Sequence, residues 1–143
     1  MKTYLPLFIV LTIAICNCGY SQQNDSNMKS QTDLNNSKVK NHTFLECMYN
    51  DPYFPNHLVD KCKNILINLS LQIENEKPEG LTELYALTHK ATDQLNDLQE
   101  EFYENDSEIE TAARECLAAE FEFISVSYGF EADIEELIAT RDW

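Results

Sequence analysis

The residues best placed to do chemistry in this sequence are five carboxylates in one segment, spaced three or four positions apart. They are Asp93, Asp97, Glu100, Glu101 and Glu104. Carboxylates at this spacing can collect a calcium ion or attract a basic partner. At about 100° per residue they centre on the side of a helix almost opposite its apolar side chains. The pattern therefore predicts a solvated helix face, and a surface for a protein partner is the alternative.

The segment that begins at Glu104 also has the acidic and polar side chains of a calcium loop. An EF-hand loop needs glycine at its sixth position, and Ile109 occupies that position here. Ser107 and Glu110 instead form the pattern of a capping box, and a helix N-terminus favours negative charge without any ion. We therefore predict a helix that starts at Asp106 or Ser107, and no metal site.

Glu120 is a different candidate, because it falls inside the apolar sector of a predicted helix. Burial raises the pKa of a carboxyl group unless a cation or several donors face it, and such groups are often functional. The alternative, which we favour, is a structural pair with a tyrosine hydroxyl, His89, Lys61 or Arg141, or a position at the rim of the bundle. No histidine lies at the Glu-x-x-His spacing of a di-iron site.

Three cysteines, Cys47, Cys62 and Cys116, lie beyond the N-terminal apolar segment. An odd number in an oxidising compartment allows at most one internal disulfide. The spacing of histidines and cysteines does not match a structural zinc site. No local motif of a catalytic nucleophile surrounds any of the three, so we expect two or three small buried thiols. No enzyme class is indicated.

Two groups of aromatic and basic residues are candidates for recognition, since aromatic residues and arginine are the usual interface anchors. Tyr53 belongs to an aromatic cluster around a proline turn, and Arg141 and Trp143 end the chain. Core packing at the ends of the bundle explains these residues equally well. We keep all three as candidate binding residues.

Helices must position these candidates, because apolar residues recur three and four apart along most of the chain. The predicted long helices cover residues 56–76, 81–102 and 106–128. Gly129 is placed to stop the third, Asp133 can cap a short last helix, and residues 44–49 form another short one. Short loops make such helices antiparallel neighbours. We predict an all-α fold, a small helical bundle of three long antiparallel helices plus one or two short helices.

The N-terminus predicts export. Residues 1–21 have the positive start, short apolar run and small residues of a secretory signal peptide. The apolar run is shorter than the roughly 20 residues of a transmembrane helix, so no transmembrane span is expected. A lipid anchor is the alternative, because Cys16 and Cys18 each end a sequence that resembles a lipobox, although neither follows a small residue. We expect a periplasmic or secreted protein, or else an envelope lipoprotein.

Two further segments complete the predicted organisation. Residues 22–41 are rich in Asn, Ser and Gln and nearly free of large apolar groups. Such a segment cannot offset its ordering entropy, so we predict a disordered polar linker. Residues 42–143 form the all-α domain.

Charge narrows the class of partner. The 143 residues contain 10 Lys and Arg against 25 Asp and Glu, a formal net charge of -15. Phosphates must be met by positive charge, so binding to nucleic acid is excluded as a leading function. With 43% hydrophobic residues the chain can still bury a core.

The segment from about Phe44 to Trp143 resembles the bacterial family known as domain of unknown function 5713. The matching stretches are MYNDPYFPNHLVDK, LYALTHKATDQLNDLQEEFYENDSEIETAAREC and YGFEADIEELIATRDW. The resemblance implies no known activity, catalytic residue, cofactor or substrate. The predicted signal peptide and linker depart from the compact form usual in the family.

These observations lead to one expected function and one alternative. We expect an exported, acidic, non-enzymatic protein-binding module without a cofactor. A basic protein is its expected partner, and it would act in the manner of an immunity protein or inhibitor. The alternative is a carboxylate-based metal-binding or enzymatic bundle that uses Glu120.

Overall fold

The computed structural model describes residues 30–143. The predicted signal peptide, the lipidation candidates Cys16 and Cys18, and the first part of the predicted linker lie outside the described residues. Within residues 30–143 all regular structure is helical, so the all-α prediction is confirmed.

The second part of the predicted linker is folded, which corrects the expectation of disorder for residues 30–41. A short 3-10 helix spans Gln31–Asp33, and helix α1 spans Ser37–Lys40. Leu34 and Val39 are 1% and 0% exposed. Two apolar side chains in an otherwise polar segment therefore reach the core, and local hydrogen bonds satisfy part of the backbone around them.

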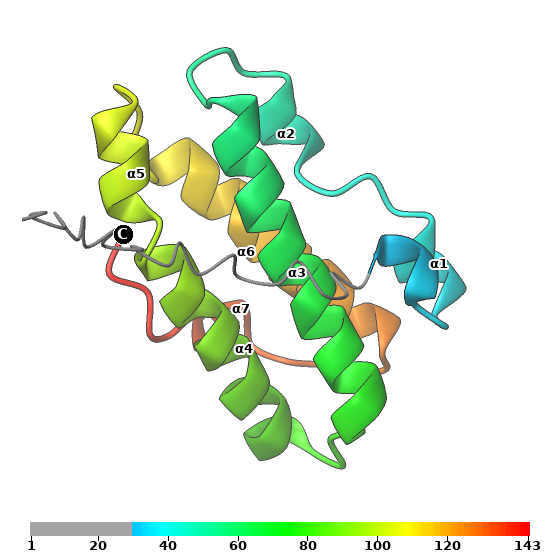
Figure 1. The fold of residues 1–143 in the computed structure, drawn as a ribbon. Helices are drawn as coiled ribbons and strands as arrows, with labels where there is room; N and C mark the ends of the chain where they lie inside the picture. Colours follow the sequence, from blue (N-terminus) through cyan, green and yellow to red (C-terminus); the bar gives the residue numbers. More distant parts are fainter. Residues whose placement is uncertain (1–29) are drawn as a thin grey trace, which may run out of the picture.

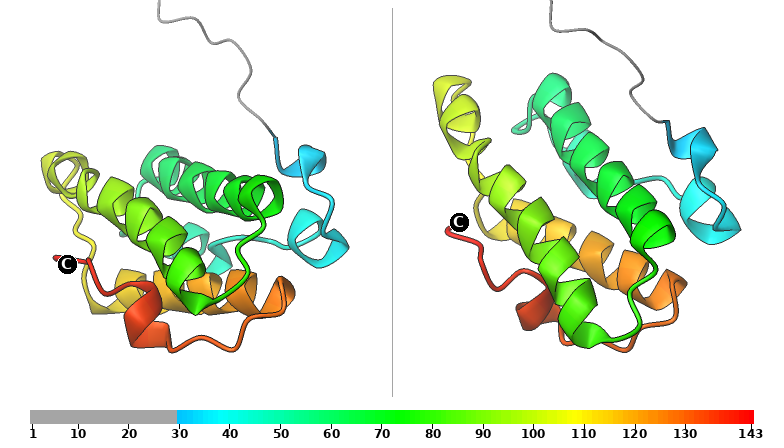
Figure 2. Two further views of the ribbon diagram at one scale, coloured as in Figure 1. Left: turned by 90° about the horizontal axis from the view of Figure 1, so that it is seen from below. Right: turned by 60° about the horizontal axis from the view of Figure 1, so that its bottom comes forward.

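The remaining helices form two layers. They are α2 (Glu46–Tyr49), α3 (Asn56–Glu76), α4 (Leu81–Asn96), α5 (Gln99–Glu104), α6 (Thr111–Ser127) and α7 (Ile134–Leu137). Helices α3 and α4 run antiparallel, side by side, as the short loop between them predicts (Figure 1). Helix α6 lies beneath them together with α7, and α5 projects at one end (Figure 2).

The second predicted helix is two helices in the structure. Helix α4 ends at Asn96 and α5 begins at Gln99, with a tight turn in which the Leu98 N–H donates to the Leu95 carbonyl. At this turn the Asn96 side chain donates to the carbonyl of Thr140. The C-terminal segment thus packs against the junction, and this long-range contact is invisible in the local periodicity.

The predicted start of the third long helix at Asp106 or Ser107 is wrong, because these residues end α5 instead. Asp106 has a positive φ of 55°, and the N–H of Ser107 donates to the carbonyl of Phe102. This is the hydrogen-bond pattern of a Schellman stop. Helix α6 begins only at Thr111, and the Ser107 side chain makes no cap bond.

Other predicted ends are confirmed. Helix α3 spans the predicted 56–76, and Asp133 caps α7 through the N–H groups of Glu135 and Glu136. Gly129 has a φ of 88° and follows the end of α6. Its N–H donates to Val126, which completes a second Schellman stop that only glycine adopts without strain.

One contiguous core fills the space between the two layers. Its largest fully buried side chains include Phe44, Phe102 and Phe121. Ile67 and Leu71, which lie off the main apolar stripe of α3, are also buried, so this helix is covered on two sides. No helix of residues 30–143 is long and apolar enough to cross a membrane.

Candidate functional site

The carboxylate of Glu120 is buried, with 7% of the residue exposed. One oxygen accepts the backbone N–H of Leu45 at 2.6 Å, and the other lies 2.7 Å from Nε2 of His42. The partner is none of the residues expected from the sequence. Leu45 has a positive φ of 56°, and its N–H is directed at this carboxylate. Glu120 therefore joins α6 to the chain segment before α2.

His42 is held on its other sides by aromatic rings. It stacks on Phe123 of α6 with ring centroids 3.8 Å apart, and meets the edge of Phe44 at 4.8 Å. The imidazole is thus fixed between two rings and a carboxylate. These contacts fix the chain around His42, just after the predicted linker, against α6.

The disulfide Cys47–Cys116 continues the same row of contacts one helical turn earlier on α6. Its Cα atoms are 6.4 Å apart. This pairing leaves Cys62 as the one thiol among the described cysteines, which corrects the expectation of two or three buried thiols. At the other end of α6, the Asn36 side chain donates to the carbonyl of Ser127 at 2.8 Å. We call these contacts of residues 35–47, together with Glu74, the N-terminal clasp.

Cys62 is the unpaired member of the described cysteines and lies buried on α3. Burial raises the pKa of its thiol to about 12. A thiol with this pKa stays protonated near neutral pH, and the thiolate is the nucleophile. The burial of Cys62 therefore supports a role in core packing.

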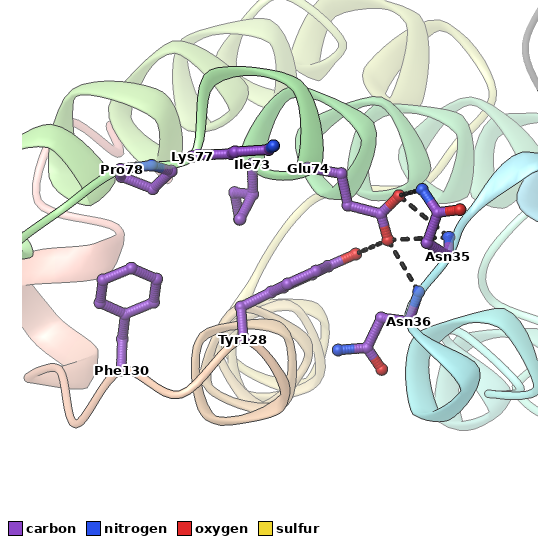
Figure 3. A pocket seen from close by; sticks show the side chains of 8 residues that line it. All are labelled: Asn35, Asn36, Ile73, Glu74, Lys77, Pro78, Tyr128 and Phe130. Carbon is purple, nitrogen blue, oxygen red and sulfur yellow. Dashed lines mark hydrogen bonds between the residues drawn. The ribbon is translucent and has the colours of Figure 1, made fainter.

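Glu74 is the second anchor of the clasp and is not among the candidate residues predicted from the sequence. Its carboxylate accepts the backbone N–H groups of Asn35 and Asn36, the Asn35 side-chain amide and the Tyr128 hydroxyl (Figure 3). Burial acts to raise the pKa of Glu74, but these donors outweigh it and lower the pKa below its usual value. Desolvation and this carboxylate raise the pKa of Tyr128.

A cavity of about 500 Å³ lies beside Glu74. Ile73, Pro78 and Phe130 form apolar walls, and the Tyr128 ring lies across it (Figure 3). The dashed contacts in Figure 3 show that both carboxylate oxygens of Glu74 already accept protein donors. The Glu74 carboxylate thus supports the fold, and the cavity offers mainly apolar surface.

The five predicted acidic residues lie on α4, on α5 and at their junction. Asp93, Asp97, Glu100 and Glu104 are exposed. Glu101 is half-buried and forms an ion pair with Lys61 of α3. Four of the five carboxylates are thus without a cation partner in the described structure, and Glu101 is a link between helices.

Two exposed tyrosines lie beside these carboxylates. Tyr103 of α5 is 72% exposed and Tyr53 of the α2–α3 loop is 40% exposed. Both line one cavity of about 310 Å³, together with Asp106, Ser107 and Glu108. We call the exposed carboxylates from Asp93 to Glu110, with Tyr53 and Tyr103, the acidic aromatic surface. The α2–α3 loop and the end of α5 meet at the same end of the molecule (Figure 1).

The predicted anchors at the C-terminus have local partners. Arg141 donates to the Glu135 carboxylate at 2.7 Å and to the carbonyl of Ile138. Trp143 packs against the hydrophobic core, half-buried. These contacts favour the packing explanation, and the acidic aromatic surface does not include these two residues.

A family model with the description Family of unknown function (DUF5713) matches residues 38–143. The chain belongs to this family. The match in this DUF5713 chain includes His42, Glu120, Tyr53 and Tyr103, and begins after Asn36. Comparisons with curated proteins and with solved structures found no match.

Three residues of this DUF5713 chain were not among the candidates predicted from the sequence: His42, Glu74 and Tyr103. Tyr103 had a usable signal, because it stands between carboxylates and off the apolar stripe that includes Phe102. His42 and Glu74 had none, since their partners lie 78 and 38 or more residues away along the chain. Only the tertiary structure brings them together.

Proposed function

We propose that this DUF5713 domain is a non-enzymatic protein-binding module that binds a basic protein through the acidic aromatic surface. The observation that supports the proposal most strongly is the negative charge of one continuous segment of the chain, from Lys90 to Arg114. Between Lys90 and Arg114 the chain has eight carboxylates and no Lys or Arg. Only Glu101 of these eight forms an ion pair within residues 30–143. The surface therefore has a strong negative potential that steers cationic partners toward it.

The exposed tyrosines add the second property of a binding surface. Charged residues give fast association and orientation, whereas aromatic side chains supply most of the contact energy. Tyr103 and Tyr53 place large amphipathic rings within the acidic region. A surface of this kind suits a protein partner.

The alternative, a metal-binding or enzymatic bundle centred on Glu120, receives less support. Both oxygens of Glu120 are bonded to Leu45 and His42. Among residues 30–143 no group of three or more His, Cys, Asp or Glu side chains is placed to hold a metal ion. Glu120 is better explained as an anchor of the clasp.

The proposal extends to location and role. The predicted signal peptide supports export to the periplasm or beyond, and the alternative of a lipid anchor at Cys16 or Cys18 keeps the domain in the envelope. In either place an acidic domain can neutralise a basic protein in the manner of an immunity protein or inhibitor. An intact mass of the protein from membrane and soluble fractions of its host distinguishes the two locations.

Capture from envelope extracts at low and moderate salt tests the proposed function. The test variant combines Asp93→Asn, Asp97→Asn, Glu100→Gln and Glu104→Gln, whose carboxylates make no hydrogen bond within residues 30–143. The control variant combines Glu76→Gln, Glu79→Gln, Glu122→Gln and Glu131→Gln, which are exposed elsewhere. Both lose the same charge, so a general charge effect would weaken them equally.

The proposal expects a basic protein that the wild type and the control variant retain and the test variant releases. Release should also increase with salt, because screening weakens exposed charge interactions. Equal capture by the two variants, or no basic protein captured at all, would contradict the proposed surface.

A further inference from the structure

The cavity between the α2–α3 loop and the end of α5 has features beyond negative charge. Tyr53 and Tyr103 contribute aromatic walls, and Asp106 and Glu108 contribute carboxylates. Its volume of about 310 Å³ is at the lower end of ligand pockets, a size that suits one side chain or a small ligand. Desolvation and the carboxylates of Glu110 and Glu108 raise the pKa of Tyr53, so its hydroxyl stays protonated.

Ser107 provides an independent indication that a ligand belongs here. The residue is 1% exposed, and its hydroxyl makes no hydrogen bond with any described residue. Buried polar groups in proteins nearly always have a partner, because an unpaired one costs free energy. Ser107 lines the same cavity as the two tyrosines. A ligand with a hydrogen-bond donor would satisfy this hydroxyl.

The nature of the cavity selects an organic cation. The residues 30–143 hold no cluster of three or more metal-ligating side chains, so a metal ion is a poor fit. Two tyrosine rings in the lining favour a cation that can stack on an aromatic ring, and neighbouring carboxylates favour a cation with several donors. A guanidinium group is planar, is always charged and carries five N–H donors in a fixed arrangement. An ammonium group has the same charge but only three N–H donors and no planar face that stacks.

We infer that the cavity between Tyr53 and Tyr103 binds the guanidinium group of an arginine side chain. The proposed function supplies the source of that side chain, a basic partner protein, and this inference rests on it. The guanidinium stacks on a tyrosine ring, donates to Asp106 or Glu108, and donates to the Ser107 hydroxyl. The cavity thereby gives the acidic aromatic surface a preference for arginine that charge alone does not provide.

Fluorine NMR of the full chain labelled with 3-fluorotyrosine tests the inference. The probes are the Nα-acetyl amides of arginine, lysine and citrulline, since citrulline has nearly the shape of arginine without its charge. We expect arginine to shift the signals of Tyr53 and Tyr103 in a saturable way, lysine to bind more weakly, and citrulline to have no effect. Equal shifts with arginine and citrulline, or equal shifts at all tyrosines, would overturn the inference.

Variants at Tyr103 separate stacking from folding, because this side chain is largely exposed and its loss leaves the core intact. Tyr103→Leu should weaken arginine binding about fivefold, whereas Tyr103→Phe should keep it within about twofold because the ring remains. Val126→Ala, at another exposed apolar position, is the control and should bind as the wild type does. Unchanged binding by Tyr103→Leu contradicts the assigned cavity.

An octa-arginine peptide distinguishes failure of the cavity from failure of the surface. One outcome is that the test variant with four substitutions binds the peptide more weakly than the control variant with four substitutions, while Tyr103→Leu binds it normally. The proposed function is then supported and the arginine cavity is wrong. If the test variant and the control variant bind the peptide equally, the proposed function is wrong. If both proposals are correct, the test variant and Tyr103→Leu each bind the peptide more weakly than the wild type.

Discussion

The N-terminal clasp and the acidic aromatic surface use the same chemical group in opposite ways. In the clasp, Glu74 and Glu120 each accept hydrogen bonds at both carboxylate oxygens. On the surface, Asp93, Asp97 and Glu100 are exposed and accept none from residues 30–143. The carboxylates with complete hydrogen-bond sets hold the fold, and those without partners remain available for a ligand.

This contrast supports the interpretation favoured from the sequence, in which Glu120 forms a structural pair. Glu120 attracts attention in the sequence because it interrupts an apolar helix face. Burial of a charge is costly unless donors surround it, and the clasp supplies those donors. Burial therefore goes with a structural role here, while the proposed binding surface is an ordinary-looking charged segment.

The largest expected effect is that of Glu120→Ala. The change leaves the Leu45 N–H and His42 in a largely buried site without their acceptor. We expect it to lower the free energy of unfolding by about 3 kcal/mol. Urea unfolding followed by circular dichroism measures this. Glu115→Ala, at an exposed position on the same helix, is the control and should change stability by less than about 0.5 kcal/mol.

Removal of the Glu74 carboxylate should have the next largest effect. Glu74→Ala loses the acceptor of Asn35, Asn36 and Tyr128, so we expect a loss of about 2 kcal/mol at neutral pH. The folded-state pKa of Glu74 is lowered, so its stabilisation is present above the unfolded-state pKa and is lost as pH falls through the folded-state pKa.

Unfolding in urea across the acidic range checks the pH dependence of Glu74. The difference in stability between wild type and Glu74→Ala should shrink as the pH falls below about 4. Glu76→Ala is exposed and should follow the wild type throughout. A constant difference between wild type and Glu74→Ala at all pH values would show that the carboxylate charge plays no part in the clasp.

The smallest expected effect has the opposite sign and lies at the acidic aromatic surface. Ser107→Ala removes a buried hydroxyl without a partner, so we expect the free protein to gain about 1 kcal/mol in stability. The same variant should bind the arginine amide more weakly. Thermal unfolding without and with that ligand measures both changes, and a destabilised variant would show that the Ser107 hydroxyl has a structural role instead.

Local signals accounted for much of the fold. The bounds of α3, the stop at Gly129 and the cap at Asp133 each depend on residues within one or two turns of the helix end, and the sequence predicts them correctly. The capping-box pattern at Ser107 failed because a competing local structure, with Asp106 at positive φ, uses the same N–H groups to end α5.

The clasp could not be predicted because its contacts are distant along the chain. His42 meets Glu120 across 78 residues, and Cys47 meets Cys116 across 69. Residues 30–41 were predicted to be disordered because their composition gives the number of apolar residues but not where those side chains pack. Leu34 and Val39 both reach the core, and that depends on the whole fold. The exposed positions of the carboxylates could be predicted, since helical periodicity places them away from the apolar face that forms the core.

The disulfide has a further consequence for the covalent form of the chain. Helices α3, α4 and α5 lie between Cys47 and Cys116, so the bond closes them into a covalent ring. A protease that cuts this ring once leaves both pieces joined through the sulfur atoms. Tyr53, Tyr103 and every carboxylate of the acidic aromatic surface belong to that ring. A single nick there would therefore release no fragment, and the proposed binding surface would stay attached to α6.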